Sequence, residues 1–244
     1  MAGDMKLQRQ SRKPAVAPVR RVGRRRDADR LADAEETREN ILSVATREFA
    51  EKGLSGARID EIAQQTNTSK RMIYYYFAGK EGLYCAVIER EYGRIRDAET
   101  ELNLEELPAR EALAQLVRRT FDWHLQHPDF VRLVMNENIH FAAHLDEVEG
   151  LQERNETVIA TLNSILRKGA RDGTLRADID PVELHMNISA LCFYTVSNRH
   201  TFRKVFGRDM GAPGVSKRRR EQIVEIIRNW CETDMQTKGS APDQ

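Results

Sequence analysis

The stretch that decides the fold is residues 57–83, which read ARIDEIAQQTNTSKRMIYYYFAGKEGL. Ile59 and Ile62 recur at helical spacing and predict a short helix. Residues 66–69 are polar and predict a turn, and a second short helix follows over residues 70–77. Two short helices joined by a four-residue turn are typical of a helix-turn-helix.

Individual residues support each boundary of this unit. Asn67 can adopt the left-handed conformation that a tight turn needs, and Ser69 is suited to N-cap the second short helix. Ala78-Gly79 interrupts that helix before Lys80 opens a longer one. A preceding helix is predicted from residue 37 to Gly53 by apolar residues at helical spacing, namely Ile41, Leu42, Ala45, Phe49 and Ala50.

The second short helix has the composition of a helix that enters the major groove of DNA. In this motif the first turn of the second helix lies nearest the base edges, and here that turn carries Lys70 and Arg71. Ile73 and Phe77, one turn apart, are expected to anchor the helix to the core. Hydroxyl, phenolic and basic groups surround this turn and are expected to contact DNA. The complete predicted set is Arg58, Thr68, Ser69, Lys70, Arg71, Tyr74, Tyr75 and Lys80.

Residues 37–83 resemble the N-terminal domain of TetR-family transcriptional regulators. The pattern Ile-Ala-x5-Ser-x3-Ile-Tyr-x-Tyr-Phe-x2-Lys-Glu-x-Leu is carried by Ile62-Ala63, Ser69, Ile73-Tyr74, Tyr76-Phe77, Lys80-Glu81 and Leu83. The resemblance implies that Tyr74, Tyr75 and Lys80 contact phosphate while Lys70 and Arg71 face bases. One departure is Thr66-Asn67-Thr68, where the family usually has Ala-Gly-Val; asparagine replaces glycine at positive φ at modest cost.

The remainder of the chain also reads as helix, so an all-α fold is predicted. Helices are expected around residues 108–125, 128–135, 158–172 and 181–202, and a last one is expected from an N-cap at Ser216 to Cys231. Residues 138–150 are ambiguous, as a short helix within a loop. The predicted domains are a disordered basic arm over 1–33, a three-helix DNA-binding domain over 34–83, and a larger helical effector-binding and dimerisation domain over 84–238.

The second domain resembles the family only in architecture. The helix from Pro181 is apolar on nearly all sides, which predicts that it is buried between two layers. The last helix carries Ile223, Ile227 and Trp230 at i, i+4 and i+7. In the family the final two helices form a four-helix bundle with those of a second copy, so the resemblance implies a homodimer that reads two half-sites.

Polar residues within apolar helices are the candidates for an effector pocket. Each such residue alone is more often a satisfied core or interface group than a ligand contact. Together they suggest a pocket for a small aromatic or carboxylated metabolite, with Phe121, His124, Met135, Asn138, His140, Asn187 and Phe193 as the predicted contacts. His140 and His144 stand four residues apart near Asp146, but a solvated loop explains them better than a metal site. No metal or other cofactor is predicted.

Composition excludes several classes of protein. The chain has 244 residues, and no run of apolar residues is long enough to span a membrane. Its three cysteines stand far apart, which argues against disulfides and for a reducing cytoplasm. The net charge of +1 conceals an asymmetry, because residues 1–26 carry nine basic groups against Asp4. This arm is interpreted as a solubilising tail or a DNA-tracking arm; a transit peptide is disfavoured by its prolines and its lack of an amphipathic period.

These patterns predict a sequence-specific, cytoplasmic, nucleoid-associated regulator of transcription. The function expected is that of a homodimeric repressor released from a palindromic operator by a small molecule. The alternative is an effector-independent architectural or division-linked DNA-binding protein of the same fold. An enzyme is not expected, since no phosphate loop, nucleophile–His–acid set or paired acids have a local signature.

Overall fold

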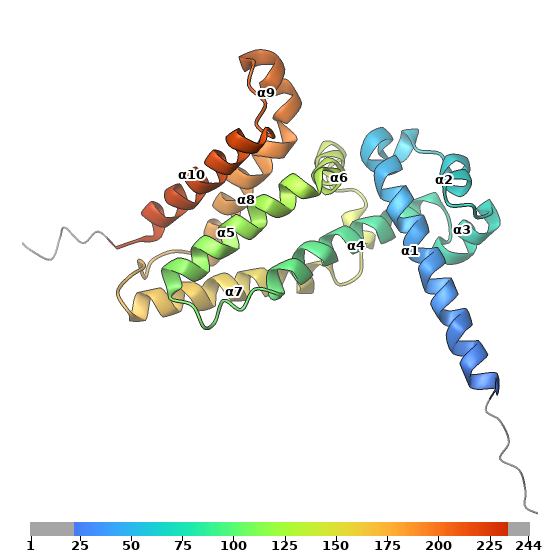
Figure 1. The fold of residues 1–244 in the computed structure, drawn as a ribbon, viewed down its shortest axis with the longest axis horizontal. Helices are drawn as coiled ribbons and strands as arrows, with labels where there is room; N and C mark the ends of the chain where they lie inside the picture. The colour runs from blue at the N-terminus through green and yellow to red at the C-terminus, as the bar shows by residue number, and fades with distance from the viewer. Residues whose placement is uncertain (1–21, 234–244) are drawn as a thin grey trace, which may run out of the picture. The chain divides into compact units, whose positions relative to one another are not determined.

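The computed structural model describes residues 22–233, and the side chains of residues 29–233. The described residues are almost entirely helical, with one isolated bridge between Leu175 and Glu232 as their extended pairing, which confirms the all-α prediction. The elements in Figure 1 are α1 (Val22–Gly56), α2 (Ile59–Gln65), α3 (Lys70–Phe77), α4 (Lys80–Thr100), α5 (Ala109–Gln126), α6 (Pro128–Ile139), the 3-10 turn η1 (Leu145–Glu147), α7 (Leu151–Arg171), α8 (Pro181–Ser197), α9 (Arg199–Phe206) and α10 (Pro213–Cys231).

The chain divides into two units, residues 1–39 and residues 40–244. Helix α1 begins at Val22, well before the predicted start near Thr37, so residues 22–33 are helical rather than disordered. Disorder was expected because the apolar residues of this segment follow no helical period. Such a period indicates that one face of a helix is buried, and a solvent-exposed helix does not need it. Arg, Ala and Leu, all strong helix formers, supply seven of the twelve residues of this segment, and extending an existing helix needs no new nucleus. The rest of the predicted arm, residues 1–21, lies outside the described residues.

The N-terminal domain is held by one apolar core beneath α2 and α3. Ile41, Leu42 and Phe49 of α1 pack with Ile62 of α2 and Ile73 of α3, and each of them is fully buried. The spacing of these residues placed one apolar face on each helix, as the sequence predicted. The core therefore fixes which face of α3 is left for solvent.

Two local devices set the angle between α2 and α3. Asn67 has φ 51°, the left-handed conformation predicted for it, and the Ser69 hydroxyl accepts a hydrogen bond from Met72 N at 3.2 Å. After α3, Ala78 (φ 57°) and Gly79 (φ 141°) turn the chain into α4. Gly82 then passes so close to α3 that a Cβ atom there would lie 2.0 Å from Phe77 O. The backbone conformation at these turns therefore fixes the orientation of α3 relative to α2 and α4.

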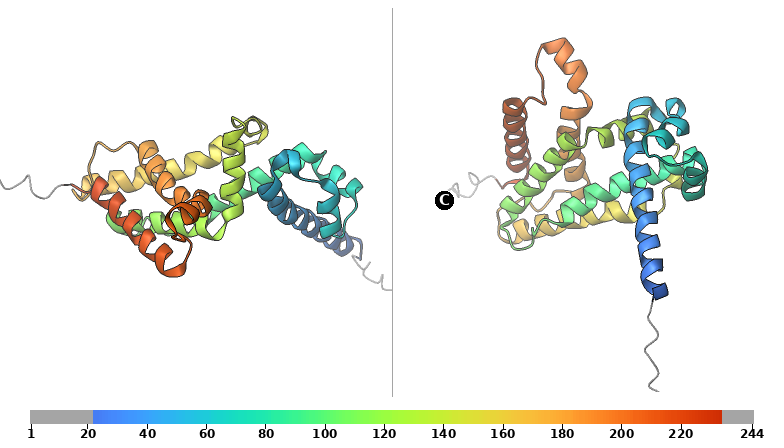
Figure 2. Two further views of the ribbon diagram at one scale, coloured as in Figure 1. Left: turned by 90° about the horizontal axis from the view of Figure 1, so that it is seen from above. Right: turned by 45° about the vertical axis from the view of Figure 1, so that its right-hand side comes forward.

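Helices α5, α7, α8 and α10 pack side by side around the second core (Figures 1 and 2). Asp180 caps α8, and its carboxylate accepts from Val182 N at 2.6 Å, as predicted. The end of α10 is tied to the turn after α7, because Arg176 N donates to Cys231 O at 2.8 Å. None of the helices within residues 22–233 combines the length and apolarity needed to cross a membrane.

Three boundary predictions in this domain are wrong. Helix α8 ends at Ser197 instead of reaching Phe202, and α9 follows as a separate helix. Helix α10 begins at Pro213, so Ser216 lies inside it and its hydroxyl donates to Pro213 O at 3.2 Å. Proline at the first helical position is the stronger start signal here. Pro108, the first residue of the helix predicted over 108–125, lies at the N-cap of α5, which begins at Ala109.

The apolar helix α8 is not buried on all sides of this single chain. Val182 is 57% exposed, Met186 is 55% exposed and Tyr194 is 47% exposed. On α10, Ile226 and Trp230 are 46% and 36% exposed. Exposed apolar surface of this kind is typical of an interaction site.

Candidate functional site

Helix α3 presents a polar, basic and phenolic face to solvent. Ile73 and Phe77 anchor its inner side in the core, as predicted, while Lys70 and Arg71 lie exposed in its first turn. A helix that is anchored on one side and polar on the other has the form that enters a major groove about 12 Å wide. The groups that could reach base edges are thus brought together on one rigid surface.

The three consecutive tyrosines of α3 are divided between solvent and core. Tyr74 is 53% exposed and Tyr75 is 78% exposed, whereas Tyr76 is half-buried and packs on the N-terminal core. The rings of Tyr75 and Tyr76 meet edge to face at a centroid separation of 5.5 Å. Two phenolic hydroxyls therefore remain available as hydrogen-bond donors for phosphate oxygens.

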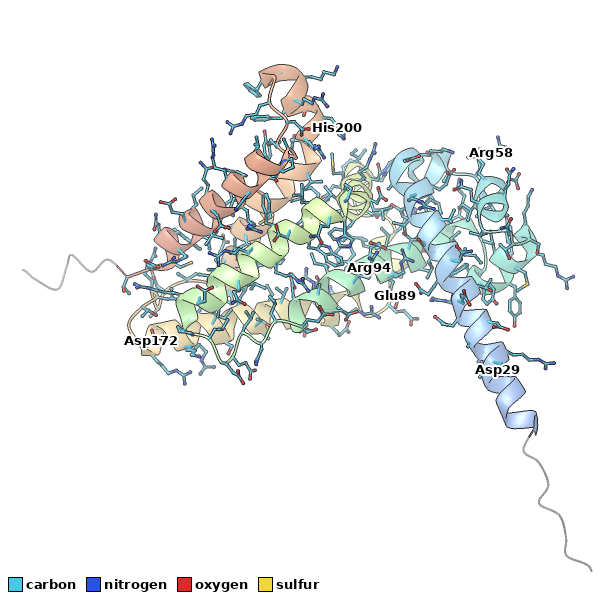
Figure 3. All side chains as sticks on the ribbon, in the orientation of Figure 1. Asp29, Arg58, Glu89, Arg94, Asp172 and His200 are labelled. Atoms are coloured by element: carbon cyan, nitrogen blue, oxygen red, sulfur yellow. The ribbon has the colours of Figure 1, made fainter. Side chains whose placement is uncertain are left out.

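The flanking basic residues lie around the same surface. Arg58 is exposed at the N-cap of α2 (Figure 3), and its backbone N donates to Glu48 Oε1 at 3.1 Å. Lys80, in the first turn of α4, is half-buried and donates to Ser55 O at 3.2 Å. Ser69 is exposed and Thr68 half-buried in the turn between α2 and α3. All eight residues predicted to bind DNA thus lie in or beside α2, α3 and the start of α4.

The acidic residues of α2 are paired with lysines. Asp60 forms an ion pair with Lys70, and Glu61 forms one with Lys52. The hydrogen bond from Lys52 lowers the pKa of the Glu61 carboxyl and raises the pKa of Lys52. Two negative charges that would repel phosphate are therefore balanced by neighbouring lysines.

A cavity of about 180 Å³ lies among α4, α5, α6, α7 and α8. His124 and Phe193, two of the predicted effector contacts, line it. Phe121 is buried in the neighbouring core, and Met135 lines a separate groove beside α6 and α8. Asn138 and His140 are exposed and bond within α6, and Asn187 is half-buried on α8 outside the cavity lining.

The sequence prediction missed the most polar residues of this cavity. Arg96 and Glu99 of α4 line it as a buried pair, with Arg96 Nη1 at 2.5 Å from Glu99 Oε2. Tyr92 and Phe130 line it as well, with ring centroids 5.2 Å apart. In a sequence, oppositely charged residues three positions apart on a helix indicate an ion pair on the solvent-exposed face. Only the packing of α5 to α8 over α4 reveals their burial.

The two histidines of the cavity are held in the neutral form. Burial lowers the pKa of His124 to about 4 and that of His185 to about 4. His124 Nδ1 lies 2.7 Å from Thr120 O, so Nδ1 carries the proton and Nε2 is a hydrogen-bond acceptor. Burial also raises the pKa of Tyr92 and of Glu99.

These histidines predict that acid destabilises the protein. Unfolded histidine has a pKa near ~6.5, so between about pH 6.5 and 4 the unfolded chain binds more protons than the folded one. The free energy of unfolding should therefore fall as the pH is lowered through this window, by about 2 kcal/mol from pH 7 to 5 for His124. Urea denaturation of the wild type and His124→Gln measures it. In His124→Gln the unfolding free energy should fall less steeply between pH 7 and 5, whereas exposed His200→Gln should behave as the wild type does. Equal pH dependence in all three proteins would show that His124 is not its source.

A buried carboxylate joins α4 to α6 and the loop after it. Glu137, 3% exposed, accepts from Tyr84 Oη at 2.7 Å, from His144 N at 3.2 Å and from His144 Nδ1 at 3.1 Å. Tyr84 also packs edge to face on Phe49 at 5.1 Å. Burial is the main reason that the pKa of Tyr84 is raised. The network connects the N-terminal core to the helix that borders the cavity.

Removing one donor should expose the coupling within this network. Tyr84→Phe and His144→Ala should each lower the free energy of unfolding by about 1–2 kcal/mol, since a buried carboxylate loses a partner. The loss of unfolding free energy in the double variant should differ from the sum of the two single losses by at least about 0.5 kcal/mol, because both side chains bond to Glu137. Urea denaturation at one protein concentration measures all four corners. Strict additivity would mean that the two donors act independently.

Among residues 22–233 no three His, Cys, Asp or Glu side chains are arranged to bind a metal ion. His144, one of the residues considered for such a site, instead bonds to Glu137. His140 bonds to the carbonyl of Asn136 at 2.8 Å. The loop histidines thus have structural partners.

The fold and the exposed face of α3 define a helix-turn-helix DNA-binding protein with a helical second domain. Residues 41–87 match the profile described as bacterial regulatory proteins of the TetR family, and residues 110–227 match the tetracyclin repressor-like C-terminal domain. The chain is 33% identical over 186 residues to the HTH-type transcriptional repressor NicS of Pseudomonas putida, covering 76% of this chain and 88% of that one. The chain belongs to the TetR family.

Two further relatives agree with this assignment. The HTH-type transcriptional regulator RutR of Escherichia coli is 30% identical over 145 residues, covering 59% of this chain and 66% of RutR. The crystal structure of the transcriptional regulator SCO4942 of Streptomyces coelicolor superposes with a TM-score of 0.61 at 30% identity, covering 80% of this chain and 98% of that one. The predictions of a DNA-binding transcriptional regulator and of a non-enzymatic protein are confirmed.

Proposed function

We propose that this protein is a homodimeric repressor that binds a palindromic operator through α3 and leaves it when a small molecule fills the cavity of the second domain. The observation that carries the proposal is the exposed face of α3, where basic and phenolic groups stand on a helix anchored by Ile73 and Phe77. The relative NicS is described as a repressor, which supports repression over activation. Such a protein acts in the cytoplasm, at the nucleoid.

The residues around α3 divide into two roles. Lys70 and Arg71, in the first turn, face base edges, and Arg is the usual bidentate partner of guanine. Tyr74, Tyr75 and Lys80 bind phosphates and fix the register of the helix, together with a second group of Arg58, Thr68 and Ser69. Lys70 must break its ion pair with Asp60 before it can contact a base, which offsets part of its binding free energy. Arg71 therefore contributes more to base recognition than Lys70 does.

Dimerisation uses the exposed apolar faces of α8 and α10. Met186 and Tyr194 on α8 and Ile226 and Trp230 on α10 would each gain burial against a second copy. A two-fold interface places the same residues on both sides, and the two copies of α3 can then meet half-sites about 34 Å apart. The exposure of α8 in one chain is the physical support for this interface.

Release requires coupling between the cavity and α3. Phe130 of α6 lines the cavity, and Glu137 of the same helix bonds to Tyr84 of α4, four residues after Lys80. A ligand that moves α6 therefore moves the support of the DNA-binding helix. A hundredfold loss of operator affinity needs only about 2.7 kcal/mol of coupling, within the usual range.

Footprinting on the DNA upstream of the protein's own gene tests the proposal. We expect protection of one palindromic segment, with contacts in two successive major grooves on one side of the duplex. Protection without two-fold symmetry would argue against the homodimer, and protection that spreads evenly along the fragment would argue against an operator.

A further inference from the structure

One buried cation in the second domain has an unused donor. Arg96 is 9% exposed, and within residues 22–233 its one hydrogen bond runs from Nη1 to Glu99. Its Nε is buried without a hydrogen-bond partner among the described residues. A buried unpaired donor is costly, so it indicates either strain or a missing partner. The edge of the guanidinium formed by Nε and Nη2 is the one that binds a carboxylate through two parallel hydrogen bonds.

Rings surround the rest of the same cavity. Tyr92 and Phe130 meet edge to face, and His124 lies 6.0 Å from Phe130 and 5.8 Å from Phe193 between ring centroids. Such a set of rings favours a flat aromatic guest, which gains edge-to-face and stacked contacts. The cavity of about 180 Å³ compares with about 150 Å³ for an engineered cavity that holds benzene, so its size suits a single ring.

We propose that the effector is a monocyclic aromatic carboxylate, with its carboxylate bound by the Nε and Nη2 edge of Arg96 and its ring held between Tyr92, Phe130 and Phe193. The inference rests on the proposed function only in calling this ligand an effector. The site itself stands on the buried guanidinium, the ring walls and the size of the cavity.

Glu99 sets the affinity of the site. In the free protein it balances the charge of Arg96, and both side chains are at most 10% exposed. When a ligand carboxylate arrives, two carboxylates compete for one guanidinium, and their repulsion weakens binding. Removing the charge of Glu99 should therefore strengthen ligand binding, whereas removing the charge of Arg96 should abolish ligand binding. Opposite effects from residues that contact each other separate recognition from general damage to the fold.

Polar groups in the lining of the cavity select substituents on the ring. His124 Nε2 is an acceptor, and Ser189 Oγ lies 3.4 Å from His185 Nε2. A hydroxyl group on the ring can donate to His124 or exchange hydrogen bonds with Ser189. Hydroxybenzoates whose hydroxyl reaches one of these groups are therefore expected to bind more tightly than benzoate.

Calorimetric titration of the full chain without DNA tests the site. The probes are benzoate and the three monohydroxybenzoates, with benzamide, acetate and 2-naphthoate as controls for charge, ring and size. We expect saturable 1:1 binding of at least one single-ring carboxylate, at least about thirtyfold weaker binding of the matching amide and of acetate, and no binding of 2-naphthoate. Equal affinity for benzoate and benzamide, or no binding of any single-ring carboxylate, would overturn the proposal.

Variants assign the binding to this cavity. Arg96→Gln should lose at least about thirtyfold in affinity, and Glu99→Gln should gain about tenfold or more. The double variant Arg96→Gln/Glu99→Gln removes both buried charges and should fold yet not bind, while exposed Arg94→Gln on the same helix should bind as the wild type does. Loss of binding in Glu99→Gln with an intact circular dichroism spectrum would contradict the proposed role of Arg96.

A gel shift with the same probe separates this site from the proposed function. If the probe binds in the calorimeter and releases operator DNA, both stand. If it binds and leaves operator binding unchanged, the cavity is a carboxylate site and the release mechanism is wrong. If operator binding is normal and no single-ring carboxylate binds, the DNA-binding function stands and this inference is wrong.

Discussion

Replacing Arg71 with alanine is expected to lower operator affinity at least about hundredfold, because a homodimer places this side chain in both half-sites. One good bidentate contact to a base contributes about 1–3 kcal/mol to discrimination, and the two-fold symmetry doubles the loss. The fold should remain intact, since Arg71 is exposed and exposed substitutions of this kind change stability by about 0.5 kcal/mol or less. Fluorescence anisotropy with the footprinted segment measures the affinity.

Two control variants sharpen this experiment. Arg171→Ala removes an exposed arginine at the end of α7 and should leave operator affinity unchanged. Lys80→Ala should weaken binding to operator and random DNA alike, as expected for a phosphate contact. If Arg71→Ala binds the operator as well as the wild type does, α3 does not read bases through its first turn.

A carboxylate on the exposed face of α8 is expected to abolish the dimer. Met186→Glu places a charge where a second copy would bury an apolar side chain, and an unpaired charge in such an interface costs several kcal/mol. Operator affinity should fall by about 10²- to 10⁴-fold, because the second DNA-binding domain is no longer held near the second half-site once the first is bound. Sedimentation velocity at micromolar protein gives the state of assembly, and anisotropy gives the affinity.

The matched control for this variant is Ile139→Glu. Ile139 is 66% exposed at the end of α6, so the same charge is added to an apolar position outside α8 and α10 that is at least as accessible as Met186. It should sediment as the wild type does. If Met186→Glu remains a dimer, a different surface joins the two copies.

The DNA-binding unit could be predicted from sequence because local rules determine it. Ser69 caps α3, Asn67 supplies the positive φ of the turn, and Ile73 and Phe77 stand one turn apart. Each of these features depends on residues only a few positions away. The same holds for Asp180, whose cap could be predicted because proline follows it.

The cavity of the second domain could be predicted only in part, since tertiary packing creates it. His124 and Phe193, two of the predicted contacts, line it. Arg96 and Glu99 were missed, because only the helices that cover α4 make a charged pair at i, i+3 a buried one. Asn138 and His140 attracted attention as polar residues after an apolar run, yet that run ends at the surface. The exposure of α8 was likewise invisible, since an apolar helix can be buried by its own chain or by a second copy.

The affinity of the wild-type protein for its upstream palindrome, relative to random DNA of the same length, tests the account most directly. Both are measured by competition anisotropy at physiological salt. A protein that reads bases through α3 in two half-sites should prefer the palindrome by at least about 10³-fold. A ratio near one, with affinity for both DNAs falling steeply as salt rises, would contradict the account and identify an architectural DNA-binding protein instead.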